Sequence, residues 1–293
     1  FGGAERDYQL FVNGAFVGRG VPPSPYYYKY YDEVDLGPHL TAGNNCIAVL
    51  VSQIGAPQAG LLAELVDADG QPLLATDAGW RVTAQTGWSV LNTRDGVENN
   101  NFQEYFDADR HPHGWERPGF DDTAWPEPRL YPRLGARHCP WPRMVPREIP
   151  PLAEWEVPPQ AVTYTEEGLD ILSRYRSESV SVVLSAAGQP LQYARLDDVD
   201  ALCRDDGETV LQVSTEHHRD PAFDGIYAPA VVLDFGRVIT GYLTVELEGA
   251  AGGRLSFALR RLGELFGSTD WHPEHTGAPE FGILAIIAGS LYV

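Results

Sequence analysis

Adjacent acidic residues are the first groups in this chain whose types could do chemistry. The candidate pairs among them are Asp121 and Asp122, Glu166 and Glu167, Asp197 and Asp198, and Asp205 and Asp206. Two carboxyl groups that face one glycosidic bond can hydrolyse it, at separations of about 5–5.5 Å for retention or about 6.5–9.5 Å for inversion. Neighbours on an extended chain point to opposite faces, so no pair forms such a site alone. We predict no catalytic residues and expect turn or solvated-surface roles for these acids; a pair from distant strands stays open.

Histidine, cysteine and glycine patterns offer no better candidate for chemistry. The histidines include three close pairs in loop-like stretches: His111 and His113, His217 and His218, and His272 and His275. None of these pairs has a cysteine or carboxylate partner at a recognised ligand spacing, so we predict no metal site there. Three widely spaced cysteines disfavour a disulfide framework. The chain has no GxSxG, P-loop or GxGxxG fingerprint, so nucleophilic and nucleotide chemistry lack support.

The tyrosine-rich run from Tyr26 to Tyr31 is the best candidate for contacting a sugar. Aromatic faces stack on the apolar side of a pyranose, while tyrosine hydroxyls and the amine of Lys29 supply polar contacts. Alternate tyrosines on a strand also serve as core or rim packing, and that structural reading stays open. Within this run we predict Tyr26, Tyr28 and Tyr30 as carbohydrate-binding residues.

Short β-strands must position these residues. Runs of Val, Ile and Leu alternate with Gly- and Pro-bearing turns, and long amphipathic helical patterns are scarce, which predicts an all-β fold. Tyr8–Val17 predicts a hairpin, because Asn13 and Gly14 tolerate the positive φ of a type I′ turn. Ile47–Val51 is typical of a central strand, and Leu61–Leu74 predicts a second hairpin about the turn Asp67–Gly70.

An aromatic loop at Gly114–Pro128 is expected to close the first group of strands. Trp115, Phe120 and Trp125 have too much apolar area to stay in water, and each gains a few kcal/mol, roughly, on burial. The Asp121-Asp122-Thr123 run can bond nearby backbone N–H groups and fix an irregular turn between those anchors. Such a loop closes a β-sandwich rather than building a reaction centre.

A proline-rich window divides the chain. Ten prolines fall within Pro126–Pro159, which excludes a helix or a central strand and indicates an extended connector. Beyond it, five segments predict strands: Ser179–Leu184, Thr209–Val213, Val231–Phe235, Gly241–Leu247 and Arg254–Leu259. The last two are expected to pair as a hairpin, and Phe281–Val293 as one or two strands cut off before their partners. We predict a sandwich at residues 1–128, a connector at 129–160 and a second, truncated sandwich at 161–293.

Charge narrows the range of partners. The formal net charge of −20 over 293 residues disfavours nucleic acid and anionic membrane surfaces and suits a neutral ligand. The apolar run at the end of the chain is too short for a membrane span, which needs about 20 residues. Sparse cysteine and no visible signal peptide favour the cytoplasm over secretion.

Four stretches, in their order and spacing, resemble the N-terminal accessory region of bacterial α-L-rhamnosidases of the glycoside hydrolase family 78 type. They correspond to a strand–NG–strand segment, a following strand segment, a closing aromatic loop and a segment of the next sandwich: Tyr8–Gly20, Tyr30–Val51, Phe102–Pro126 and Val231–Gly253. The resemblance implies two antiparallel β-sandwiches of the jelly-roll or galactose-binding-like kind. It weakens from Phe266 onward.

The resemblance also implies a function. The family hydrolyses terminal α-L-rhamnose with carboxylates of a later helical (α/α)₆ barrel, and nothing in this chain matches that barrel. It therefore implies a non-catalytic accessory region, inactive alone, that supports the barrel of the same polypeptide and binds a rhamnose-containing glycan. Two alternatives stay open: a free-standing carbohydrate-binding module and an inactive structural fragment.

Calcium is the one cofactor that the resemblance suggests. Some N-terminal domains of this type hold rhamnose through a calcium ion, and Asn13 or Asp7 near the hairpin would supply an oxygen ligand. Asn13 thereby joins the predicted carbohydrate-binding residues. The turn itself explains Asn13 without any ligand, so we predict no obligatory cofactor.

Overall fold

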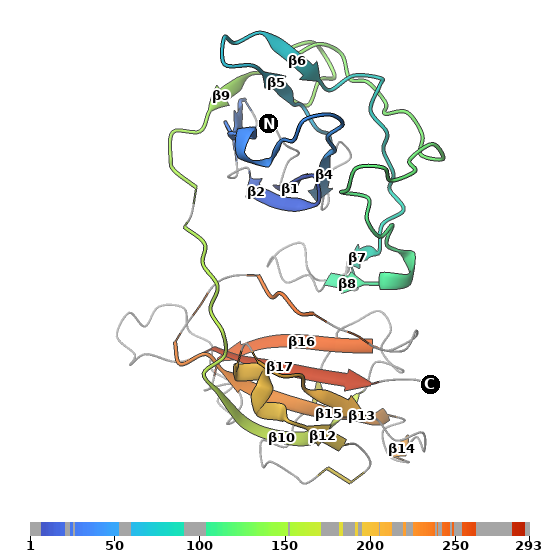
Figure 1. Ribbon diagram of the computed structural model, residues 1–293, viewed down its shortest axis with the longest axis vertical. Coiled ribbons are helices and arrows are strands. Elements are labelled where there is room, and N and C mark those ends of the chain that lie inside the picture. Colours follow the sequence, from blue (N-terminus) through green and yellow to red (C-terminus); the bar gives the residue numbers. More distant parts are fainter. Residues whose placement is uncertain are drawn as a thin grey trace. The chain divides into compact units, whose positions relative to one another are not determined.

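Figure 1 shows the computed structural model, in which the chain divides into two compact units. The first unit comprises Phe1–Ser89 and Tyr105–Leu152, and the second comprises Val90–Glu104 and Ala153–Val293. The structure describes residues 7–20, 24–25, 27–52, 60–90, 104–151, 153–170, 182–183, 191–192, 195–204, 206–212, 219–220, 225–237, 239, 242–246, 248, 254–261 and 283–290.

The prediction of an all-β chain with antiparallel sheets is confirmed. Among the described residues, helical structure is limited to three short 3₁₀ turns: η1 (Gly37–His39), η2 (Ala108–Arg110) and η3 (Val199–Cys203). No helix in the described part is long and apolar enough to cross a membrane. The closure of the sheets into two sandwiches, and the predicted domain limits, stay predictions.

The first unit is built around a three-stranded sheet in the order β2–β1–β4. These strands are β1 (Asp7–Val12), β2 (Ala15–Gly20) and β4 (Ile47–Ser52), all antiparallel. The predicted hairpin is confirmed, with Asn13 at φ 53° and Gly14 at φ 86° in its turn. Tyr8, Leu10 and Val12 of β1 are buried and form the core with Leu36.

The prediction that Ile47–Val51 is a central strand is wrong in the described residues. β1 occupies the centre, and β4 pairs with β1 along one edge alone. Successive residues of β4 are half-buried on both faces, with Ala48 buried. Cover on both faces explains an unbroken apolar run without a second neighbouring strand.

Four two-stranded pairs lie outside the two larger sheets in the described residues, and three of them are formed by strands that precede β10. β5 (Glu64–Val66) and β6 (Pro72–Ala75) form the predicted second hairpin, and β7 (Trp88–Val90) pairs with β8 (Glu104–Phe106). β3 (Lys29–Tyr31) runs parallel to β9 (Met144–Pro146), which differs from the all-antiparallel expectation. β9 comes from the proline-rich window, so part of that window is strand rather than connector.

The aromatic loop takes the irregular form that the sequence predicts. The Asp121 carboxylate accepts hydrogen bonds from the amide and the hydroxyl of Thr123, at 3.1 and 2.6 Å. Phe120 and Trp125 pack with ring centroids 5.3 Å apart. Trp115 packs edge-on against Phe11 of β1 at 5.6 Å, so the loop is anchored on the first sheet.

The second unit contains a larger sheet in the order β11–β10–β15–β17–β16, with β14 beside β15; the neighbouring strands β15, β17 and β16 can be followed in Figure 1. Its strands are β10 (Ala161–Asp170), β11 (Val182–Val183), β14 (Arg219–Asp220), β15 (Gly225–Asp234), β16 (Arg254–Arg261) and β17 (Ile283–Ser290). Val231, Leu233 and Phe235 form its core. Leu196 of β12 (Arg195–Asp197) and Val199 of η3 pack against them, and β13 (Val210–Gln212) pairs with β12.

The predicted hairpin of Gly241–Leu247 with Arg254–Leu259 is wrong. Tyr242–Glu246, the described part of the first segment, is exposed and forms no strand. β16 instead pairs with β17, which comes from the apolar tail and lies between β16 and β15. A strand with a partner on each side satisfies its backbone groups in both directions, so this tail is a partnered central strand.

Candidate functional site

Tyr27, Tyr28 and Tyr30 form one group of rings, called here the tyrosine surface. Tyr27 and Tyr28 meet edge-to-face with centroids 5.1 Å apart, and Tyr28 meets Tyr30 in the same manner at 5.3 Å. The hydroxyl oxygens of Tyr28 and Tyr30 lie 3.2 Å apart and share a hydrogen bond. Tyr27 is 59% exposed, whereas Tyr28 and Tyr30 are half-buried. The surface therefore offers one accessible ring beside a pair of linked hydroxyls.

Backbone bonds hold this surface in place. The Tyr30 amide donates to Ser24 Oγ at 3.1 Å, and the Lys29 amide donates to the Arg143 carbonyl at 2.8 Å. Lys29 is the first residue of β3 and takes part in the pairing with β9 through its backbone. The tyrosines are thus held by two segments that are far apart in the sequence: one precedes β3 and contains Ser24, and the other precedes β9 and contains Arg143.

The electrostatic surroundings keep the Tyr28 hydroxyl protonated. Its hydrogen bond with Tyr30 is the main cause that raises the pKa of Tyr28, with partial desolvation and the Glu148 carboxylate adding to it. A protonated phenol donates as well as accepts, which suits a ligand rich in hydroxyl groups.

Two of the four predicted sugar-contacting residues, Tyr28 and Tyr30, come together in this surface. Tyr26 lies outside the described residues. Asn13 sits in the hairpin turn, where its Nδ2 donates to the His39 carbonyl at 2.9 Å and to Asn45 Oδ1 at 2.8 Å. Its Oδ1 accepts from the Cys46 amide at 2.9 Å. These bonds give Asn13 a structural task, and its role toward a sugar stays a prediction.

The same bonds bear on calcium. The Asn13 amide oxygen is turned to a backbone N–H, and no group of three or more His, Cys, Asp or Glu side chains that could hold a metal was found within the described ranges. These contacts of Asn13 do not favour an ion, and calcium stays a hypothesis.

Sequence reasoning placed Tyr27 within the candidate run but not among the predicted carbohydrate-binding residues, and it missed Glu148. Strict alternation along a strand would direct Tyr27 away from Tyr28. Tyr27 lies in a turn before β3, where the alternation does not hold and neighbouring rings can meet. Glu148 follows β9 in the proline-rich window, so only the pairing of β3 with β9 brings it near Tyr28.

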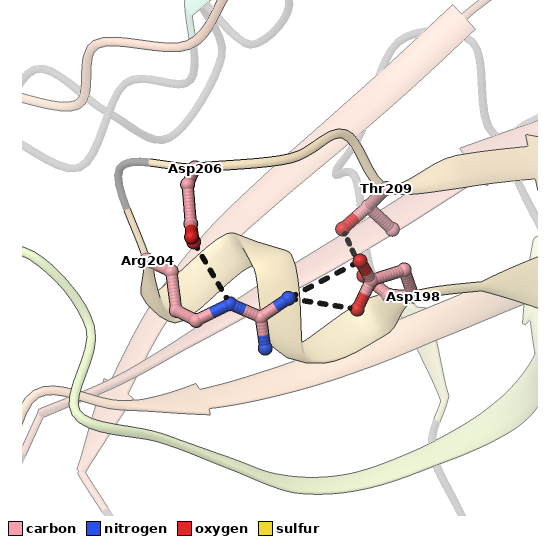
Figure 2. A network of polar contacts seen from close by, with 4 residues as sticks. All are labelled: Asp198, Arg204, Asp206 and Thr209. Atoms are coloured by element: carbon pink, nitrogen blue, oxygen red, sulfur yellow. Dashed lines mark hydrogen bonds and ion pairs between the residues drawn. The ribbon is translucent and has the colours of Figure 1, made fainter.

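The acidic pairs have structural surroundings where they are described. Figure 2 shows Arg204 between two carboxylates: its Nη2 lies 3.0 and 3.1 Å from the oxygens of Asp198, and its Nε lies 3.1 Å from Asp206 Oδ1. The Thr209 hydroxyl donates to the Asp198 carbonyl at 2.8 Å. The Asp198 carboxylate, and then that of Asp206, raise the pKa of Arg204. Asp198 is therefore a turn residue here.

Glu166 departs from the expected solvated role. It is fully buried in β10, on the same face as Tyr164, because residues two apart on a strand share a face. Burial, and then the Glu166 charge, raise the pKa of the Tyr164 hydroxyl. The flanking sequence gave no sign of this burial, since Glu167 follows directly and the run reads as polar.

The first histidine pair is packed among aromatic rings. His111 lies 5.0 Å from the Phe106 ring and 6.5 Å from the Trp115 ring, measured between centroids. Burial, together with His113, lowers the pKa of His111. His113 Nε2 is hydrogen-bonded to the Ala108 carbonyl at 2.8 Å. The other two histidine pairs lie outside the described residues.

Comparison with curated proteins identifies a relative among the α-L-rhamnosidases. Over 146 residues, 49% of this chain, the sequence is 28% identical to an α-L-rhamnosidase of Streptomyces avermitilis. The resemblance to α-L-rhamnosidases is confirmed. The matched part covers 12% of that rhamnosidase, so this rhamnosidase-like chain corresponds to a small part of the relative's length. No family model matches the chain.

Among solved structures, the rhamnosidase-like chain is similar to a GH78 family rhamnosidase of Bacillus sp. GL1. The sequence identity is 23% and the TM-score is 0.49, and the alignment covers 99% of this chain and 28% of that one.

Proposed function

We propose that this rhamnosidase-like chain is a non-catalytic accessory region that binds a rhamnose-containing glycan at the tyrosine surface. The observation that supports the binding site is the exposed Tyr27 ring beside the hydrogen-bonded hydroxyls of Tyr28 and Tyr30. The observation that supports the sugar class is the rhamnosidase relative.

The chemistry of the ligand matches this arrangement. Rhamnose is a neutral 6-deoxyhexose, whose methyl group and axial C–H bonds form an apolar face beside several hydroxyls. An exposed ring covers such a face, while phenol hydroxyls exchange hydrogen bonds with the sugar. The net charge of −20 does not oppose a neutral ligand as it would an anionic one.

The absence of hydrolysis is proposed on the surroundings of the acids. Asp121 and Asp198 are engaged in turns, and Glu166 lies inside a sheet without exposed surface. Catalysis on a glycosidic bond needs two carboxyls that both reach the substrate. We expect the purified full chain to release no phenol from an aryl α-L-rhamnoside, and turnover that survives purification would overturn this part.

Titration calorimetry with rhamnose tests the binding site. Tyr27→Ala is expected to weaken binding by about 2- to 12-fold, since an aromatic contact contributes roughly 0.5–1.5 kcal/mol. Tyr242→Ala is the matched control, because Tyr242 is 65% exposed and lies in the second unit. Equal affinity of Tyr27→Ala and the wild type would move the site elsewhere, and no heat from the wild type would favour a purely structural chain.

A further inference from the structure

A buried ionic cluster lies where the two parallel strands β3 and β9 end. Asp32 directly follows β3 and Arg147 directly follows β9, and the Arg147 amide donates to the Tyr31 carbonyl at 3.0 Å. The Arg147 Nε lies 2.5 Å from Asp32 Oδ1, with the side chains 14% and 10% exposed. The pair thus joins the two strands through side chains as well as backbone.

The first sheet supplies a third member. Tyr8 of the central strand β1 is 2% exposed, and its hydroxyl donates to Asp32 Oδ2 at 2.9 Å. Each carboxylate oxygen of Asp32 therefore has its own contact: Arg147 at one and Tyr8 at the other. Burial, and then the Asp32 charge, raise the pKa of Tyr8, so its hydroxyl remains a donor throughout the neutral range.

The Asp32 carboxylate occupies space that a side chain at position 20 would fill. Gly20 stands opposite Tyr8 in the β1–β2 register, and a Cβ at Gly20 would overlap Asp32 Oδ2. It would also lie 2.9 Å from an Nη atom of Arg147. Asp32 and Arg147 therefore both pack against the sheet at Gly20, a position at which only glycine leaves room for them.

Such a cluster is poorly explained by stability alone. A buried ion pair often contributes no more than apolar residues of the same volume, although removal of one partner is costly. The β3–β9 pair has three residues in each strand, and so short a two-stranded element is marginal by itself. Its position must come from contacts outside its own ladder.

We infer that Tyr8, Asp32 and Arg147 are positioning residues that fix β9 beside β3 and thereby set the geometry of the tyrosine surface. The step from geometry to sugar affinity rests on the proposed function. The step from the cluster to the β3–β9 pairing does not, and it is tested separately.

Hydrogen exchange on the full chain tests the pairing. In Arg147→Met the amides of Lys29 and residue 147, which bridge β3 and β9, are expected to exchange at least about fivefold faster. The Asn13 amide, bonded to the Cys46 carbonyl in the first sheet, is the internal reference and should not change. Arg143→Met is the matched control, because Arg143 is exposed on the same segment.

The double variant Asp32→Leu/Arg147→Met separates positioning from stability, because it leaves no unpaired buried charge. We expect its thermal midpoint to return toward that of the wild type while the two amides still exchange fast and rhamnose binds at least about fivefold more weakly. Full recovery of amide protection in this variant, or unchanged exchange in Arg147→Met, would overturn the inference. If Arg147→Met does not fold, Tyr8→Phe, which removes one hydroxyl, decides in its place by the same two amides.

The binding and exchange readouts fail independently. A wild type that gives no heat with rhamnose would refute the proposed function, while the exchange rates would still decide whether the cluster positions β3 and β9. A wild type that binds, with a double variant that binds equally well, would refute the inference and leave the proposed function intact.

Discussion

At the scale of single residues, a side chain that the sequence suggests for ligand binding can instead make hydrogen bonds that hold the fold. Asn13 is the plainest case, because an Asn-Gly pair predicts a turn while its amide also suits a sugar or an ion. In the structure the amide bonds to His39, Asn45 and Cys46, three residues that follow it at some distance in the chain. No local pattern identifies such partners, so sequence reasoning predicted the turn and could not predict the cross-links.

Substitution of Asn13 separates its backbone role from its side-chain role. Asn13→Gly keeps the positive φ and loses the three bonds, so we expect a loss of about 1–3 kcal/mol in the free energy of unfolding. Asn13→Ala should cost about 1–2 kcal/mol more, because alanine disfavours φ 53°. Urea unfolding of both variants measures the difference, and equal stabilities would show that the backbone conformation costs nothing here.

His111 makes the stability of the chain depend on pH. Its pKa is lowered in the folded state, chiefly by burial and then by His113, while Glu116 acts in the opposite direction. The unfolded chain therefore binds this proton first, so the stabilisation is complete above the unfolded value of about 6.5 and is lost as pH falls toward the lower folded value. We expect unfolding curves of His111→Gln to vary less between pH 7 and pH 5 than those of the wild type. A His113→Gln variant serves as the control, since His113 lowers the pKa of His111 less than burial does.

At the scale of elements, local chemistry predicted what depends on neighbours in sequence. The Asn13-Gly14 hairpin and the Asp67–Gly70 turn were predicted correctly, because turn residues act within four positions. The order of strands was not: β1 rather than β4 is central, and β17 rather than Gly241–Leu247 pairs with β16. A hydrophobic run indicates that other parts of the chain bury the faces of a strand. It does not indicate which strands pair with it, because pairing depends on contacts between segments distant in the sequence.

The central place of β1 has a measurable consequence. Leu10 is 0% exposed, whereas Leu50 on β4 is only half-buried. Leu10→Ala should cost about 2–5 kcal/mol in the free energy of unfolding of the first unit, and Leu50→Ala clearly less. Denaturant unfolding followed by tryptophan fluorescence compares the two. A larger loss of stability in Leu50→Ala than in Leu10→Ala would indicate that β4, rather than β1, is the central strand.

At the scale of the whole molecule, the parts of the site that sequence reasoning found and missed differ in how far apart their residues lie. Tyr28 and Tyr30 were visible because they belong to one run. Arg147 and Glu148 were not, because a proline-rich window reads as a connector and conceals the strand β9. The all-β class followed from the strand and turn patterns, whereas the family resemblance, which came from the order of four stretches rather than from any one of them, added the expectation of two sandwiches.

The net charge of −20 gives a prediction for the whole chain. At about 0.01 M ionic strength the field of such a protein extends roughly 30 Å, and at about 0.15 M it falls to roughly 8 Å. Binding of neutral rhamnose should therefore keep the same affinity at both ionic strengths, because no charge is brought into that field. A uronic acid offered to the same surface should bind more weakly at low salt and gain affinity as salt is added. Calorimetry at the two ionic strengths measures this, and a rhamnose affinity that changes strongly with salt would indicate that a charged group, rather than the tyrosine rings and hydroxyls, governs recognition.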